Sequence, residues 1–555
     1  MRSIIKLFGK LLASDARRFR QALANPQAAQ QTVQADILQR LVASEYGKSL
    51  GISALDDWQR IPIVDYCEIE DWIESQKVSQ SSLLTPEPIS FYERTSGSRG
   101  PAKWIPYTRS LKRSFSHMFC VWAQDLIVNG PAFSTGKIYF CISPQLGGAT
   151  PDQEVPVGLE DDSEYLDGWL QWVLRPFLVA PPGLNRLRDP EEFKAKLCLA
   201  LLQEEKLEII SIWSPSFLKV HLDYIDGHRS QLCEKLQDRV SAKRLQLITD
   251  PEVPWTTIWP ELKLISCWDS VNAADQAQCL RSLFPGVMVQ GKGLLATEAP
   301  MTIPLIAAQG CVPLLNEVFF EFEDEAGKIH LLHQLEIGQV YSIILSQKGG
   351  LYRYRMGDRV RCSHLYLNTP CLEFLGRSHT TSDLVGEKLH EAFVSQVLER
   401  LALEGSYFKS LVPATQPQAH YILLLDSANR EPEAIAQQLD EALSESPHYR
   451  YARLLGQLSP VQVWVSKQMP EIVTQFKIQS GIKWGDIKHQ VLDPTPVKAA
   501  RFDCFKEPTI AAGTPNIQLL KTGQHLHWEE PFLAQSQLLP GELDSGSTPL
   551  SPLEP

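Results

Sequence analysis

Paired cysteines, long apolar runs and an excess of basic residues are all missing from this sequence of 555 residues. Its eleven cysteines lie between Cys67 and Cys504 without any C-x-x-C pair. That spacing indicates no zinc site and predicts free thiols in a reducing compartment, the cytoplasm. No apolar run approaches the roughly 18 residues that a membrane span needs. Acidic residues outnumber basic ones by 65 to 53, and the net charge of −12 argues against nucleic acid or an anionic membrane as the main partner.

What the sequence does contain is typical of a folded protein with more than one domain. Hydrophobic residues make up 44% and charged residues 21% of the chain, as in ordinary globular proteins. The residues Met1 to Phe8 are basic and amphipathic, but their apolar stretch is too short for a secretory signal, so we expect a first helix there. Proline, serine and glycine dominate residues 526–555, which predicts a disordered tail.

Short apolar runs alternate with helical patterns after a mostly helical start up to about residue 85. Runs typical of buried strands begin at Ile138, Ile209, Leu262 and Val287. Strands separated by helices predict an α/β sheet, with ligands at the carboxyl ends of the strands. From Val318 to Tyr354 the pattern becomes that of hairpins, so we expect antiparallel β structure attached to the α/β body.

The later part of the chain predicts a second domain. A polar stretch from Ser378 to Ser382 is a candidate hinge, and two helices alternate with two strands beyond it. We therefore predict a large N-terminal α/β domain at 1–377 and a smaller α+β domain at 378–525.

The loop from Thr95 to Lys103 is the strongest candidate for a binding site. It combines hydroxyls, glycine amides and one lysine between regular elements, and exposed backbone N–H groups in such a loop bind anionic oxygens. It is not a Walker A sequence, because Pro101 and Ala102 separate Gly100 from the lysine. A polyphosphate cradle and a plain Ser/Gly surface turn are the two interpretations of this loop.

Three later motifs supply further polar groups. Ala296-Thr297-Glu298 follows a predicted strand, and its hydroxyl and carboxylate suit a phosphate oxygen and a Mg²⁺ ion. Asp358 follows Gly357 and is either a ribose ligand or a residue of a tight turn. Arg377 is either a nucleotide contact or a structural ion-pair partner.

These motifs together resemble those of the adenylate-forming acyl synthetases. More narrowly, the chain resembles the Gretchen Hagen auxin-responsive family of acyl-acid amido synthetases, particularly its bacterial members. Matching stretches also occur at Ser44 to Lys48, Ile61 to Tyr66, Gly338 to Tyr341 and Gly485 to Lys488. The resemblance covers roughly residues 30 to 495, and four motifs in register are a stronger signal than any one of them.

The resemblance implies an ATP- and Mg²⁺-dependent acid–amino acid ligase. A carboxylic acid is activated as an acyl-adenylate, and an amine, usually that of an amino acid, then takes the acyl group. Alternatives are an acyl-CoA ligase with the same first step and a non-catalytic acyl- or nucleotide-binding protein. Domain 1–377 would bind ATP and the acid, and domain 378–525 would move between the two steps. The acid, the amine and the oligomeric state are not predicted.

The resemblance also implies roles for individual residues. The phosphate cradle would consist of Thr95, Ser96, Gly97, Ser98, Gly100 and Lys103. Ala296 and Thr297 would lie at the α-phosphate, Glu298 would hold Mg²⁺ and Asp358 would hold the ribose. Arg377 would contact the nucleotide, and Lys488 would stabilise charge in one half-reaction.

Two tryptophans and two histidines are further candidates for site residues. Trp213 and Trp268 at strand ends are candidate walls of an acyl pocket. His221 and His228 lie seven residues apart on a predicted helix, and we expect a solvated helix face rather than a metal site.

Overall fold

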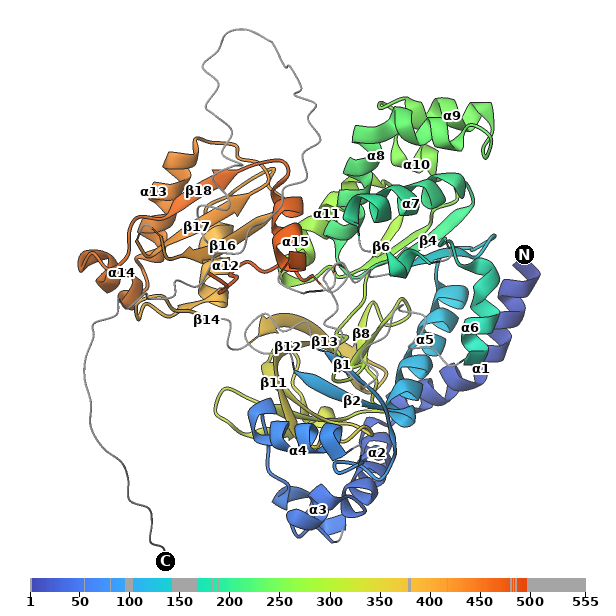
Figure 1. Ribbon diagram of the computed structural model, residues 1–555. Coiled ribbons are helices and arrows are strands. Elements are labelled where there is room, and N and C mark those ends of the chain that lie inside the picture. Colours follow the sequence, from blue (N-terminus) through green and yellow to red (C-terminus); the bar gives the residue numbers. More distant parts are fainter. Residues whose placement is uncertain are drawn as a thin grey trace, which may run out of the picture. The chain divides into compact units, whose positions relative to one another are not determined.

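The structure is a computed structural model that describes residues 2–53, 55–79, 81–94, 103–141, 168–181, 183–187, 189–377, 381–416, 418–479, 482, 484 and 487–496 (Figure 1). The chain separates into two compact units at 1–506 and 507–555. Every element described below belongs to the first unit. The predicted tail at 526–555 lies outside the described residues.

Helices dominate the N-terminal part, as the sequence predicts. They are α1 (Arg2–Ala24), α2 (Pro26–Val42), α3 (Glu45–Ser49) and α4 (Tyr66–Ser79), with the 3₁₀-helix η1 (Leu55–Arg60). Proline starts α2, where its missing N–H costs no hydrogen bond. Ser44 caps α3 by accepting a hydrogen bond from the N–H of Gly47.

The hairpin of β1 (Ile89–Arg94) and β2 (Trp104–Thr108) carries the predicted phosphate cradle between its strands. Cradle residues 95–102 lie outside the described residues. Helix α5 (Arg109–Asn129) begins directly after β2, with the Thr108 side chain as its N-cap and Gly130 as its C-cap. The cap residues at both ends of α5 are thus side-chain and backbone types that favour a helix start and a helix end.

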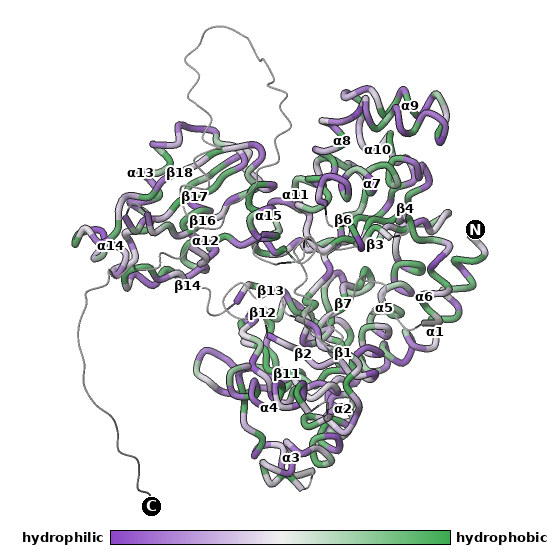
Figure 2. The backbone as a smooth tube through the Cα atoms, in the orientation of Figure 1, coloured by the Kyte–Doolittle hydropathy of each residue, from purple (hydrophilic) through white to green (hydrophobic). Residues whose placement is uncertain are grey.

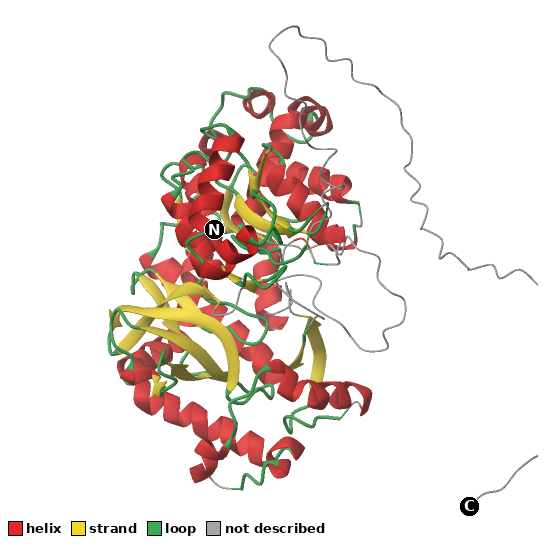
Figure 3. Ribbon diagram, turned by 90° about the vertical axis from the view of Figure 1, so that its left-hand side faces the viewer, coloured by secondary structure: helices red, strands yellow, loops and turns green. Residues whose placement is uncertain are grey.

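A four-stranded parallel sheet forms the α/β body. Its order along the sheet is β3 (Lys137–Phe140), β4 (Leu207–Ser211), β5 (Leu264–Cys267) and β6 (Met288–Gly291). Figure 3 shows helices on either side of these strands. The helices of this region are α6 (Gly168–Leu174), α7 (Pro190–Gln203), α8 (Pro215–Leu236), α9 (Ala242–Thr249), α10 (Trp255–Ile258) and α11 (Ala274–Leu283). The two central strands, β4 and β5, are largely buried, as expected when helices cover a sheet, whereas the edge strand β6 is half-buried.

Antiparallel structure follows as predicted between Val318 and Tyr354, but it begins earlier, at Thr302, and continues to Arg377. The two-stranded sheet consists of β7 (Thr302–Leu305) and β8 (Gly310–Pro313). The five-stranded sheet has the order β10 (Ile329–Leu331), β9 (Phe319–Glu323), β11 (Val340–Ser346), β12 (Tyr354–Tyr366) and β13 (Thr369–Arg377). Arg353, just before β12, forms a buried ion pair with Glu321, its Nε lying 2.9 Å from Oε2. This pair fixes the point where β12 begins.

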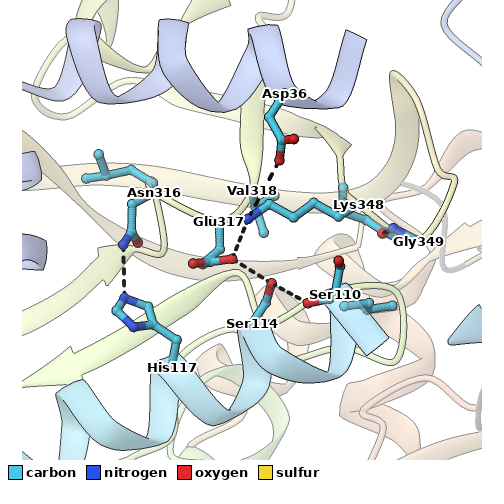
Figure 4. Close-up of polar contacts among 12 residues, drawn as sticks. Asp36, Ser110, Ser114, His117, Asn316, Glu317, Val318, Lys348 and Gly349 are labelled. Atoms are coloured by element: carbon cyan, nitrogen blue, oxygen red, sulfur yellow. Dashed lines mark hydrogen bonds and ion pairs between the residues drawn. The ribbon is translucent and has the colours of Figure 1, made fainter. Parts of the chain in front are cut away.

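A polar network ties the antiparallel region to the helices (Figure 4). The Nζ of Lys348 lies 2.8 Å from Glu317 and 4.0 Å from Asp36 of α2. Ser114 of α5 donates a hydrogen bond to the same Glu317 carboxylate. Because these side chains satisfy one another, the network has a structural role.

The C-terminal elements have a hydrophobic core of their own. The mixed sheet contains β16 (Lys409–Ala414), β17 (His420–Leu425) and β18 (Gln462–Val465), with the first pair antiparallel and the second parallel. The other elements are β14 (Thr381–Ser382), β15 (Leu389–His390), α12 (Glu391–Arg400), α13 (Pro432–Leu443), α14 (Pro447–Leu454) and α15 (Met469–Gln479). This is α+β structure, although the sequence did not predict β16, α14 or α15.

The ten cysteines among the described residues are all free thiols, most of them buried. No helix in the described ranges is long and apolar enough to cross a membrane.

Candidate active site

Lys103 lies at the start of β2, between two tyrosines that are distant in sequence. Its Nζ donates a hydrogen bond of 3.3 Å to the hydroxyl of Tyr354. The same atom is 5.3 Å from the ring centroid of Tyr66 and 6.0 Å from that of Tyr354, within the range of a cation–π contact. The Tyr66 hydroxyl accepts a hydrogen bond from the N–H of Trp104. The lysine that closes the predicted cradle is therefore positioned by side chains from outside the cradle.

Ala296, Thr297 and Glu298 form a tight turn in the segment between β6 and β7. The N–H of Ala296 donates to the carbonyl of Ala299 at 3.2 Å. The carbonyl of Thr297 accepts a hydrogen bond of 2.7 Å from Tyr107, a residue of β2. This bond ties the turn to the strand that follows the cradle. Glu298 is a buried residue.

The carboxylate of Glu298 lies close enough to Tyr354 and Arg377 to act on both. Burial raises the pKa of Tyr354, and the negative charge of Glu298 raises it further. The pKa of the Arg377 guanidinium is raised first by Asp358 and then by Glu298. Tyr354 therefore interacts with both Lys103 and Glu298.

Asp358 lies within a strand, and the prediction of a tight turn after Gly357 was wrong. Gly357 has φ +76° and belongs to an irregularity of the β11–β12 pairing between Ser342 and Ile344. A left-handed glycine serves a β-bulge as readily as a turn, and a bulge re-aims the next side chain. Asp358 pairs across the ladder with Arg377, the last residue of β13.

The Asp358–Arg377 pair leaves one carboxylate oxygen available. Arg377 donates from Nε to Oδ1 of Asp358 at 3.0 Å. The Asp358 residue is 3% exposed, and its Oδ2 has no hydrogen-bond partner among the described residues. Buried oxygens of this kind are rare, and their usual partner is a ligand or a water molecule. Arg377 therefore forms an ion pair with Asp358, and one buried acceptor oxygen of Asp358 remains beside it.

Lys488 lies over Trp268, with its Nζ 4.9 Å from the ring centroid. Trp268 in turn lies 5.6 Å from Trp213, centroid to centroid. Both tryptophans follow parallel strands directly or within two residues, at their carboxyl ends. Lys292, one residue after β6, donates from Nζ to Ser211 Oγ at 2.8 Å and lies 4.9 Å from the Trp213 ring. Two ammonium groups and two indole rings therefore meet at this edge of the sheet.

The strand ends approach each other closely beside these lysines. A Cβ added at Gly291 would lie 2.1 Å from Oδ1 of Asp269, so only glycine fits there. Asp269 pairs with Arg281 at 3.2 Å, and burial raises the pKa of the Asp269 carboxyl. Glycine at position 291 thus allows a carboxylate to approach the end of β6.

The sequence motifs are brought together only in part. Hydrogen bonds join Lys103 to Tyr354, Arg377 to Asp358 and Thr297 to Tyr107, and the charge of Glu298 acts on Tyr354 and Arg377. Thr95, Ser96, Gly97, Ser98 and Gly100 lie outside the described residues. Within the described ranges, no group of three or more His, Cys, Asp or Glu side chains forms a metal site.

Sequence reasoning missed three side chains at this site, Tyr66, Tyr354 and Lys292. Each of them lies inside or next to a sequence motif described above. Tyr66 is the last residue of the stretch that begins at Ile61, and Tyr354 is the first residue of the stretch that ends at Asp358. Lys292 stands between two glycines before the Thr297 motif. The sequence pattern that could have identified these residues is a tyrosine or a lysine within or beside a motif.

His221 corrects another expectation, because it is buried and not solvated. Its Nδ1 lies 2.7 Å from the carbonyl oxygen of Phe217, and its ring stacks on Trp484 at 5.5 Å. Its Nε2 has no hydrogen-bond partner among the described residues, and burial lowers the pKa of His221 to about 4. His228 is half-buried and stacks on Tyr224.

Three profiles of one protein family match the chain in order. They are the GH3 family N-terminal domain at residues 15–254, the GH3 family central domain at 311–377 and the GH3 family C-terminal domain at 387–495. Together they match more than half of the chain. The chain belongs to the GH3 family. The resemblance to the Gretchen Hagen family is thereby confirmed.

Individual members of the GH3 family are distant in sequence but alike in length and fold. The chain is 21% identical over 483 residues to indole-3-acetic acid-amido synthetase GH3.2 of Arabidopsis thaliana, covering 73% of this chain and 85% of the relative. It is 25% identical over 549 residues to jasmonoyl-L-amino acid synthetase GH3.5 of Oryza sativa subsp. japonica, covering 80% and 89%. The solved AtGH3.15 acyl acid amido synthetase in complex with 2,4-DB matches with a TM-score of 0.72 at 18% identity, covering 87% of this chain and 94% of that one. This likeness confirms the predicted α/β fold class.

Proposed function

We propose that this GH3 protein is an ATP-dependent acid–amino acid ligase. It activates a carboxylic acid as an acyl-adenylate with release of pyrophosphate, and an amino acid then displaces AMP to form an amide. The observation that carries the proposal is the group formed by Lys103, Tyr354, Glu298, Arg377 and Asp358. Hydrogen bonds join Lys103 to Tyr354 and Arg377 to Asp358, and the charge of Glu298 acts on both Tyr354 and Arg377, so polar groups from four separate motifs interact in a chain of this family.

Asp358 and Arg377 form the nucleotide end of the proposed site. The buried Oδ2 of Asp358 is an acceptor without a described partner, which fits a ribose hydroxyl. The half-exposed guanidinium of Arg377 keeps donors beyond the one used by Asp358, and these suit ribose or phosphate oxygens. The ion pair keeps the carboxylate oriented before the nucleotide arrives.

Lys103, Thr297 and Glu298 form the phosphate end. The ammonium of Lys103, held by Tyr354, adds to the phosphate cradle of Thr95, Ser96, Gly97, Ser98 and Gly100. Ala296 and Thr297 flank the α-phosphate. Glu298 holds Mg²⁺, a cation that commonly binds one or two carboxylates together with phosphate oxygens. When bound, Mg²⁺ neutralises charge that develops on the phosphates.

The acid lies at the carboxyl ends of the parallel strands, where open α/β sheets bind ligands. Trp213 and Trp268 provide apolar walls, and Lys292 provides a cation for the substrate carboxylate. Lys488 approaches the same place over Trp268 and stabilises charge during one half-reaction. We assign residues 1–377 to binding of ATP and acid and residues 378–525 to a domain that moves between the steps.

Acid-dependent exchange of radiolabelled pyrophosphate into ATP tests the first step. Purified full-length protein with MgATP should show exchange with some members of a panel of aromatic, jasmonate-like and fatty acids. Adding amino acids or coenzyme A to the preformed adenylate identifies the acceptor by mass spectrometry. Absence of exchange across the whole panel would refute the enzymatic proposal, and a thioester without any amide would refute the amide-forming step.

A further inference from the structure

The outward face of helix α1 carries a stripe of exposed apolar side chains. Ile4 is 51% exposed, Leu7 58% and Leu11 62%. Spacings of three and four residues place them on one side of the helix. Large apolar side chains scattered singly over a surface need no explanation, but a continuous stripe marks an interaction surface.

The stripe is not needed to hold α1 in the fold. On the other side of the helix, Leu12, Phe19 and Leu23 are buried, and α1 packs along α5. A Cβ added at Gly9 would lie 2.9 Å from the Ile127 side chain of α5, so this side chain packs directly against the backbone of α1. The helix is thus fixed by its inner face, and the outer stripe remains exposed along a rigid support.

The charge of α1 is opposite to that of the whole chain. The helix contains six basic residues and one acidic residue, Asp15, giving a net charge of +5, whereas the chain has a net charge of −12. Lys6, Lys10 and Arg17 are exposed, and the helical period places them to one side of the stripe. Hydrophilic and hydrophobic residues alternate along α1 in Figure 2. The overall acidity of the chain therefore hides a locally basic surface.

An exposed tryptophan lies on the neighbouring segment. A Cβ added at Gly136 would lie 2.8 Å from Phe177 and 3.5 Å from Ile5 of α1, so the 3₁₀-helix η3 (Arg175–Phe177) adjoins the first turns of α1. Helix α6 leads directly into η3, and its Trp172 is 77% exposed. Tryptophan is enriched at the boundary between lipid and water.

We propose that α1 binds an anionic lipid surface, lying flat with Ile4, Leu7 and Leu11 among the lipid head groups and with Lys6, Lys10 and Arg17 at the phosphates. An apolar stripe beside lysine and arginine is the pattern of an interfacial helix. An acidic protein partner would match the basic residues but leave the apolar stripe unexplained. A second copy of the chain would place like charges of two α1 helices together.

Flotation of the full-length protein with lipid vesicles tests the proposal. Vesicles of phosphatidylcholine with phosphatidylglycerol should carry the protein upward at low salt and release it at high salt, because the charge contribution is screened. The variant L7Q/L11Q should reduce the bound fraction about tenfold, since binding scales with buried apolar area. The variant K6E/K10E should abolish the preference for anionic vesicles. Both variants should keep the wild-type melting temperature and pyrophosphate exchange with a water-soluble acid.

A matched control comes from helix α14, which is also basic and apolar on its exposed side. Leu454 is 78% and Leu455 54% exposed, so L454Q/L455Q removes comparable side chains elsewhere and should leave flotation unchanged. The proposal is overturned by absent flotation, by equal binding to pure phosphatidylcholine, or by loss of binding in the α14 variant instead. It is also overturned if light scattering shows that L7Q/L11Q converts a dimer to a monomer. None of these results bears on the ligase proposal, which rests on exchange alone.

Discussion

Replacement of Asp358 by asparagine separates the nucleotide role of this residue from its structural role. Asparagine keeps the shape of the side chain but loses the negative charge and one of the two acceptor oxygens. In the structure Oδ1 is used by Arg377, while Oδ2 is buried without a described partner. With the amide oxygen accepting from Arg377, the amide nitrogen can only donate to the proposed ribose hydroxyl, so the charge-assisted bond from that hydroxyl to the carboxylate is lost.

The structure indicates how much Asp358→Asn should change kcat/KM for ATP and the free energy of unfolding. Loss of one hydrogen bond to a charged group costs about 1.5–3 kcal/mol, which corresponds to about a 10- to 150-fold decrease of kcat/KM for ATP. The folded state should lose only about 0–1 kcal/mol, because the Arg377 side chain is 48% exposed and solvent weakens the ion pair. Asp358→Asn should therefore impair ATP use strongly while leaving the free energy of unfolding almost unchanged.

Pyrophosphate exchange at varied ATP, together with urea unfolding, measures both quantities. Glu373→Gln is a matched control, because Glu373 pairs with Arg361 at 2.7 Å across the same two strands but is exposed. It should leave kcat/KM for ATP unchanged. The reasoning is refuted if Asp358→Asn has wild-type kcat/KM, if Glu373→Gln lowers it equally, or if lost activity follows lost stability.

Three further predictions follow from the site and the core. Glu298→Gln should slow pyrophosphate exchange about 100-fold or more, because a bound metal supplies several kcal/mol of charge stabilisation. If the exchange rate and its dependence on Mg²⁺ are unchanged, Glu298 does not bind the metal. Lys292→Met should raise KM for the acid about tenfold by removing one charge-assisted contact, with KM for ATP unchanged; Lys219→Met, at an exposed ion pair, is the control. For His221, the folded pKa of about 4 lies below the unfolded value, so the folded state binds fewer protons than the unfolded chain between these values. The free energy of unfolding should then fall by about 3 kcal/mol as pH decreases from about 6.5 to 4. Urea unfolding at several pH values measures this decrease, which should be smaller in His221→Gln.

Helices and strands were predictable from the sequence where the local signals agree with one another. The helix after Thr108 was predictable because its cap, apolar spacing and glycine end all agree. The four parallel strands were predictable because a strand covered on both faces is a short apolar run. By contrast, β16 contains Pro413 and begins with Lys409, so its sequence lacks the usual strand signal.

The site was predictable as a set of motifs but not as a set of contacts. Gly357 predicts a left-handed backbone, yet nothing local distinguishes a turn from the bulge in which Asp358 lies. The hydrogen bond between Lys103 and Tyr354 joins residues 251 positions apart, beyond the reach of any local pattern. Lys219 and Asp223, two residues to either side, are exposed and paired with each other, whereas the ring of His221 lies against Phe217 and Trp484.

The placement of Lys103 between Tyr66 and Tyr354 has a consequence for exchanging parts between family members. A transplanted cradle loop would bring its lysine but not the two hydroxyaromatic rings that flank it, since these come from α4 and β12. A lysine without those neighbours has many more accessible rotamers, and holding it still has an entropic cost. In the proposed nucleotide site, the working unit is therefore the loop together with both tyrosines, and chimaeras that move all three should retain activity lost by those that move the loop alone.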